Sequence, residues 1–164
     1  MITPKMAQAI NKQINAELAS AYLYLAMAAW FKSQNLDGAA KWLEIQAQEE
    51  QGHAMKFFHF LGDRGGVVEL AALAKPAAKW KSALDAFKVV AAHEAMVTGL
   101  INGLMELAVA EKDYAAQEQL QWFVKEQVEE EASAGAIVAR LAMVGESKSG
   151  LLMMDYKLAK RGQS

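Results

Sequence analysis

Apolar residues recur at steps of three and four positions along four long stretches of the chain, which is the spacing of residues on one face of an α-helix. In the first stretch this core-facing stripe includes Ile10, Ile14, Ala21, Tyr24, Ala28 and Phe31. Thr3 followed by Pro4 is a helix-start signal, and the glycines at 65 and 66 are a stop signal. With similar signals further along, the pattern predicts helices over residues 3–32, 37–64, 82–111, 113–144 and 149–161.

The lengths of the connections predict how these helices are arranged. Only a few residues separate the first helix from the second and the third from the fourth, so each pair must form an antiparallel hairpin. The second helix is ~42 Å long, and returning along it takes about 13 extended residues. Residues 67–81 are just enough. The expected fold is therefore all-α and a single domain over residues 1–164: a four-helix bundle with one long crossover, plus a short fifth C-terminal helix.

The amino-acid composition also favours helices, and it excludes several kinds of partner and metal ligand. The 164 residues are 54% hydrophobic, with 32 alanines and only 2 prolines, which favours long packed helices over strands. With 17 basic and 19 acidic residues, there is no basic field for nucleic acid or an anionic membrane. The N-terminus lacks signal-peptide features, and no apolar run reaches the ~20 residues of a membrane span, so we expect a cytoplasmic protein. Because cysteine is absent, any metal must be held by oxygen and imidazole.

The core-facing stripes are interrupted by acidic residues at mid-length. One glutamate falls in the stripe of each long helix, and these are Glu17, Glu50, Glu94 and Glu130. When each hairpin is folded about its turn, all four come to the same height. A weak internal repeat agrees with this, because Glu17 and Glu94 are 77 residues apart, as are His53 and Glu130. The sequence therefore predicts one polar layer across the middle of the bundle.

Such a layer needs cations. Burying four carboxylates without counter-charge costs several kcal/mol each, and no Lys or Arg occupies a stripe position to pair with them. Two divalent ions would neutralise the four negative charges. His53, three residues after Glu50, adds an imidazole, which favours Fe, Mn or Zn over Ca or Mg.

The residues of this layer and the segments around them resemble the motifs of a known family. Glu17 with Tyr24, the segment Gln-Glu-Glu-Gln-Gly-His at 48–53, Glu94, and the segment at 120–131 resemble the motifs of bacterial non-haem ferritins, members of the ferritin-like di-iron family. The likeness covers the whole chain. The layer matches the known pattern of ferritin-like di-iron bundles, with the second Glu-x-x-His replaced by Gln127-x-x-Glu130.

The resemblance implies specific ligands for two irons. Glu17, Glu50 and His53 would hold one iron, and Glu94 with Glu130 would hold the other, with Glu50 bridging the two.

The resemblance also implies roles around this pair. Glu49, Glu126 and Glu129, together with Glu130, match an additional third iron site. Gln127 would be a hydrogen-bonding group behind the ligands, and Tyr24 a hydrogen-bond partner or an electron donor. Without the resemblance, core packing explains Tyr24 about as well, and a solvated face explains Glu126 and Glu129 better.

The activity implied by the resemblance is ferroxidase activity with iron storage. Fe(II) would be oxidised by O2 or H2O2 and stored as a mineral inside a hollow homo-oligomer of 24 subunits. Haem is not implied, because bacterioferritins have a methionine where Gln51 stands and a histidine where Glu130 stands. Independently, we expect the apolar fifth helix to find no groove on its own bundle and to form an oligomer interface.

Other classes of protein are weaker fits to the sequence. A rubrerythrin-like di-iron peroxidase would normally carry a cysteine-ligated iron, and this chain has no cysteine. A metal-free helical interaction protein is the alternative from another class, and metal analysis of the purified chain would separate it. A DNA-binding mini-ferritin is disfavoured because no lysine-rich tail is present.

Overall fold

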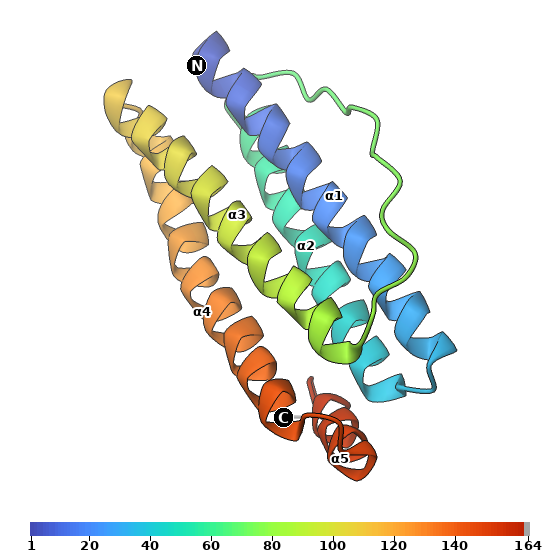
Figure 1. The fold of residues 1–164 in the computed structure, drawn as a ribbon. Helices are drawn as coiled ribbons and strands as arrows, with labels where there is room; N and C mark the ends of the chain where they lie inside the picture. Colours follow the sequence, from blue (N-terminus) through green and yellow to red (C-terminus); the bar gives the residue numbers. More distant parts are fainter. Residues whose placement is uncertain (163–164) are drawn as a thin grey trace.

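The computed structural model describes residues 1–162, and its helices form a four-helix bundle with a fifth helix at one end (Figure 1). The helices are α1 (Pro4–Ser33), α2 (Asp37–Asp63), α3 (Ala83–Ala110), α4 (Tyr114–Val144) and α5 (Lys148–Leu158). Within residues 1–162 there is no strand. The predicted fold class is confirmed. None of the described helices combines the length and apolarity that a membrane span requires.

The two hairpins are α1–α2 and α3–α4, and a long connection joins them. This crossover, residues 64–82, runs along the outside of the bundle from the end of α2 to the start of α3 (Figure 1). As a result α3 is parallel to α2, as the connection lengths predict. Asn35 and Lys112 reverse the chain within the hairpins at positive φ, 58° and 55°.

Side chains cap the helix starts that the sequence marks. Thr3 Oγ1 accepts a hydrogen bond from the Met6 amide at 3.2 Å, and Ser82 Oγ accepts one from the Asp85 amide at 3.0 Å. Asp113 does the same for α4. The observed helix bounds lie within three residues of those expected from the sequence.

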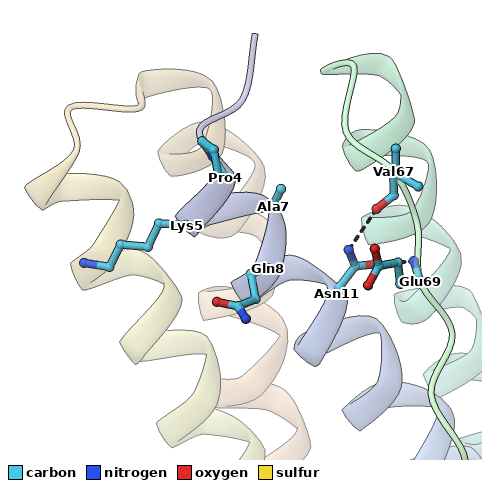
Figure 2. A pocket seen from close by; sticks show the side chains of 7 residues that line it. All are labelled: Pro4, Lys5, Ala7, Gln8, Asn11, Val67 and Glu69. Carbon is cyan, nitrogen blue, oxygen red and sulfur yellow. Dashed lines mark hydrogen bonds between the residues drawn. The ribbon is translucent and has the colours of Figure 1, made fainter.

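The crossover is attached to α1 by one asparagine. Asn11 Nδ2 donates to the Val67 carbonyl at 2.9 Å, and Asn11 Oδ1 accepts from the Glu69 amide at 2.9 Å. Figure 2 shows this pairing at the edge of an open pocket between the start of α1 and the crossover. The side-chain amide thus bonds the extended backbone much as a neighbouring strand would. None of the buried glutamates lines this pocket.

The core is divided into two apolar clusters. One, nearer the α1–α2 turn and α5, includes Phe31, Leu43 and Phe87, and the other includes Ile10 and Phe57. The polar layer lies along the helices between them.

Helix α5 corrects one expectation, because it does find a place on its own bundle. It contacts α2 and α4, and Met154 and Leu158 are buried in the first apolar cluster. Asp155 accepts hydrogen bonds from the amides of Gly38 at 3.0 Å and Ala39 at 2.7 Å, and so caps α2. A Cβ at Gly38 would lie 1.9 Å from the Asp155 carbonyl oxygen. The missing side chain at position 38 is what opens this docking site.

Candidate metal centre

The middle of the bundle holds an acidic cluster with one glutamate from each long helix. Glu17, Glu50, Glu94 and Glu130 are buried, and so is His53. The core-facing position that buries each side chain follows from its place in the apolar stripe. The structure therefore brings the four predicted glutamates into the interior.

A first group of possible ligands joins α1 and α2. One ligand atom each from Glu17, Glu50 and His53 lie within 4.8 Å of one another. Gln13 Nε2 donates to Glu17 Oε1 at 2.8 Å, whereas Glu17 Oε2 is buried without a hydrogen-bond partner among the described residues. A buried unpaired carboxylate oxygen is costly, so it marks a place where a cation would be stabilising.

A second group joins α2 and α4. His53, Glu126 and Glu130 also offer ligand atoms within 4.8 Å of one another. Gln46 spans the same two helices, since its Nε2 donates to Glu50 Oε1 at 3.0 Å and to Glu130 Oε2 at 2.8 Å. The second group thus contains Glu126, which the resemblance assigned to the third site, beside Glu130.

Glu94 lies in a hydrogen-bonded setting of its own. The Tyr24 hydroxyl donates to Glu94 Oε1, and Gln127 Nε2 lies 3.4 Å from Glu94 Oε2 and 3.2 Å from the Glu94 carbonyl oxygen. The same Gln127 Nε2 lies 3.2 Å from Thr98 Oγ1. In the described part of the chain, Glu94 belongs to neither group of three. Tyr24 and Gln127 are thus both hydrogen-bonded to Glu94.

Burial and mutual repulsion set the protonation of the cluster. Burial, with the charge of Glu50, raises the pKa values of Glu94 and Glu130 to about 7, and it raises the pKa of Glu17 well above its ordinary value. Burial opposes the charged form of His53, but the hydrogen bond and charge of Glu50 outweigh it and raise the His53 pKa. The same contact outweighs burial at Glu50 and lowers its pKa. Without metal, the cluster holds protons near neutral pH.

Tyr24 stays a hydrogen-bond donor in this setting. Burial raises its pKa well above the ordinary value, and the negative charges of Glu94 and Glu50 add to that effect.

The remaining acids predicted for a third iron site differ from one another. Glu126 is half-buried and belongs to the second group, and Glu129 is exposed. The carboxylate of Glu49 is bound by the guanidinium of Arg161, which follows α5. The structure thus brings Glu126 next to Glu130 and places a positive side chain on Glu49.

Sequence reasoning missed three residues that shape the centre. Gln46 and Gln13 each lie one helical turn before a glutamate they bond, and Gln46 falls in the stripe of α2, so the spacing could have revealed both. Arg161 has no local signal, because its position depends on how α5 docks.

The fold and this buried acidic layer define the ferritin-like class of helical bundles. The family model described as "Ferritin-like domain", of the Ferritin family, matches residues 7–144. The chain belongs to the ferritin family.

Relatives agree over nearly the full length. A protein of Bacteroides fragilis (strain 638R) named "Bacterial non-heme ferritin" is 39% identical over 161 residues, covering 98% of this chain and 100% of that protein. A protein of the same name from Campylobacter jejuni is 39% identical, covering 94% of this chain and 93% of that one. The solved structure described as an open pore ferritin from the archaeon Archaeoglobus fulgidus has a TM-score of 0.97 at 51% identity, covering 98% of this chain and 99% of that chain.

Proposed function

We propose that this protein stores iron and is a ferroxidase, oxidising Fe(II) to Fe(III) at the mid-bundle cluster. The observation that carries the proposal is the group formed by Glu17, Glu50 and His53, in which a buried carboxylate oxygen lacks a partner among the described residues. Iron is the substrate and the stored cargo. The relatives named bacterial non-heme ferritins support iron as the metal.

Two Fe(II) ions fit the charge of the cluster. Glu17, Glu50 and His53 hold one ion. Glu130 and Glu94 hold the second, with Glu50 between the two ions and Glu126 at the flank beside Glu130. Four ionised carboxylates balance two divalent ions, so the repulsion that raises the glutamate pKa values is removed on loading.

The oxidation balances with one molecule of O2 for each pair of ions. Two Fe(II) ions lose one electron each, and O2 takes these two electrons with two protons to give H2O2. When H2O2 is the oxidant, two further Fe(II) ions and two protons give two waters. Tyr24 and Gln127 hold Glu94 in place during this step through the hydrogen bonds described above.

Storage requires an enclosed volume, and we propose a hollow homo-oligomer of 24 subunits in the cytoplasm. The Archaeoglobus fulgidus neighbour, which is described as an open pore ferritin, supports a hollow assembly. Exposed apolar side chains on α5, including Leu152 at 62% and Met153 at 74%, offer surface for contacts between copies. Glu49, Glu126 and Glu129, the acids expected to form a third iron site, would receive Fe(III) as it leaves the centre.

The test combines anaerobic binding with aerobic oxidation. We expect about two Fe(II) per subunit to bind without oxygen, and rapid formation of Fe(III) with O2 consumption on exposure to air. Glu50→Gln keeps the shape of the side chain but removes its charge, so it should reduce the initial rate at least 10-fold, whereas the exposed Glu106→Gln on α3 should match the parent. Parent-like oxidation by Glu50→Gln, or no oxidation by the parent above buffer, would overturn the proposal.

A further inference from the structure

The segment that follows α5 reaches the buried glutamates through one arginine. Arg161 Nη1 donates to Gln46 Oε1 at 2.7 Å and to the Trp42 carbonyl at 3.3 Å. Its Nη2 donates to the Glu49 carboxylate, and its guanidinium carbon lies 4.2 Å from the centroid of the Trp42 ring. All these partners are on α2, so Arg161 is fixed against one face of that helix.

Gln46 links Arg161 to the glutamates of the candidate metal centre by hydrogen bonds. It is fully buried, and its Nε2 donates to one oxygen of Glu50 and one of Glu130. An amide has an accepting end and a donating end. Because Arg161 binds the accepting end, the donating end must face the two glutamates. A hydrogen-bonded path therefore runs from the C-terminal segment to carboxylates on two helices of the bundle.

We propose that Arg161 is a positioning residue for the metal centre, with two separable effects. Through Gln46 it fixes the orientation of Glu50 and Glu130. By its charge on Glu49 it occupies the flank where the third iron site is expected, so a metal ion must compete with it there. This inference rests on the proposed function, because it concerns the same cluster.

The two effects need different properties of the side chain. Holding Gln46, Glu49 and the Trp42 carbonyl together requires the planar fork of donors of an arginine. Neutralising Glu49 requires only a positive charge. Arg161→Ala removes both properties, and Arg161→Lys keeps the charge but not the fork. Lys160→Ala is the matched control, because this substitution removes the same charge from the neighbouring position. The Lys160 side chain lies over the exposed Tyr156 ring.

The experiment is an anaerobic titration of each metal-free variant with Co(II), followed by its visible absorption and by the number of ions bound per subunit. For the parent we expect two tightly bound ions, whose absorption spectrum is the reference, and a further ion only at much higher Co(II) concentration. Arg161→Ala should bind a further ion at least 10-fold more tightly than the parent and should change the spectrum of the first two. Arg161→Lys should change the spectrum without strengthening the further site. Lys160→Ala should match the parent.

The outcomes separate this inference from the proposed function. An Arg161→Ala protein with the parent's spectrum and ion count, at equal helical content and particle mass, would overturn the inference alone. If Arg161→Ala altered the helical content, the test would rest on the Co(II) spectrum of Arg161→Lys. A spectrum like that of the parent would then overturn the proposal that the arginine's planar set of donors orients Glu50 and Glu130. If the parent bound no Co(II), the proposed function and this inference would both fall.

Discussion

Glu130 shows how strongly a single side chain of the buried layer is coupled to its neighbours. Gln46 holds one of its oxygens, and His53 and Glu126 lie beside it. Burial and the charge of Glu50 raise its pKa to about 7. A carboxylic acid with such a pKa gives up its proton when a divalent ion arrives, so metal binding and proton release are linked at this position.

The effect of this linkage on stability has a definite sign. The pKa values of Glu94 and Glu130 are 4.5 in the unfolded chain and about 7 in the folded protein. Folding therefore takes up protons at pH values between 4.5 and about 7. Stability is therefore highest at low pH within this window and is lost as the pH rises through about 7. The raised pKa of His53 acts in the same direction, and the lowered pKa of Glu50 acts only below about 4.5. Burial lowers the pKa of His93, so this residue opposes the trend, but only below its ordinary value of 6.5.

We therefore predict that the metal-free protein is more stable at pH 6 than at pH 8. Each of the two glutamates contributes about 1 kcal/mol to the difference over these two pH units. Thermal unfolding in chelator, followed by circular dichroism at both pH values, measures it. With saturating Co(II) the order should reverse, because protons compete with the ion. A metal-free Tm that is flat or rises with pH would contradict the prediction.

Replacing Glu130 should separate stability from metal binding. Glu130→Ala removes a buried acid that repels Glu50, so in chelator we expect it to unfold at no lower a temperature than the parent. It leaves three carboxylates for two divalent ions, so the gain in Tm on anaerobic Fe(II) addition should shrink and rapid oxidation should be lost. His53→Ala should weaken the first ion instead.

The same two measurements provide the check on the Glu130 variant. Glu106→Ala, at an exposed position of α3, is the control and should keep both the metal-induced shift and the rate. A full metal-induced shift with fast oxidation in Glu130→Ala would mean that the second ion is held elsewhere.

At the scale of elements, the junction of α5 with the start of α2 combines a helix cap with a close backbone contact. Asp155 caps two amides at the N-terminus of α2, whose own cap residue, Leu36, makes no side-chain cap bond. Because the negative charge also lies at the positive end of the helix dipole, the cap and the docking of α5 reinforce each other.

We predict graded effects at this junction. Asp155→Ala should lower the free energy of unfolding by about 1–2 kcal/mol, as expected for loss of a cap. Gly38→Ala should cost more, because its Cβ would meet the backbone of α5 and displace the helix. Denaturant unfolding measures both, and Gly52→Ala is the control, since a Cβ there meets no atom within 4 Å. Equal stability of Gly38→Ala and the parent would show that α5 docks differently.

Elements could be predicted from the sequence where the residues that determine them are close together along the chain. The helices and hairpins follow from local periodicity, caps and connection lengths, and those expectations were met. The four glutamates were expected in the core for the same reason, and the structure buries them. The place of α5 could not be predicted, because it depends on a missing Cβ at Gly38, far away in the sequence. Arg161 was missed because its contacts exist only after α5 docks.

At the scale of the whole molecule, we predict a large particle without haem. Light scattering should give a mass many times the 17.9 kDa of one chain, and the visible spectrum should lack a Soret band in proportion to subunits. The first expectation follows from the exposed apolar side chains of α5, and the second from Gln51 in place of a methionine. A monomer in solution would contradict the first, and a haem for every subunit, or one for every two, would contradict the second.

The division of the bundle into two hairpins has a consequence for the order of folding. Glu17 and Glu50 belong to one hairpin and Glu94 and Glu130 to the other, and the crossover is the chain connection between the two hairpins. Contacts within a hairpin are local and form early, whereas docking of the hairpins comes later. Docking is also the step that collects the four acids, so in chelator it must overcome their mutual repulsion or take up protons. Refolding by stopped-flow should therefore speed up with Co(II) or at lower pH in its late phase alone, and the ion that the finished protein binds also helps to assemble it.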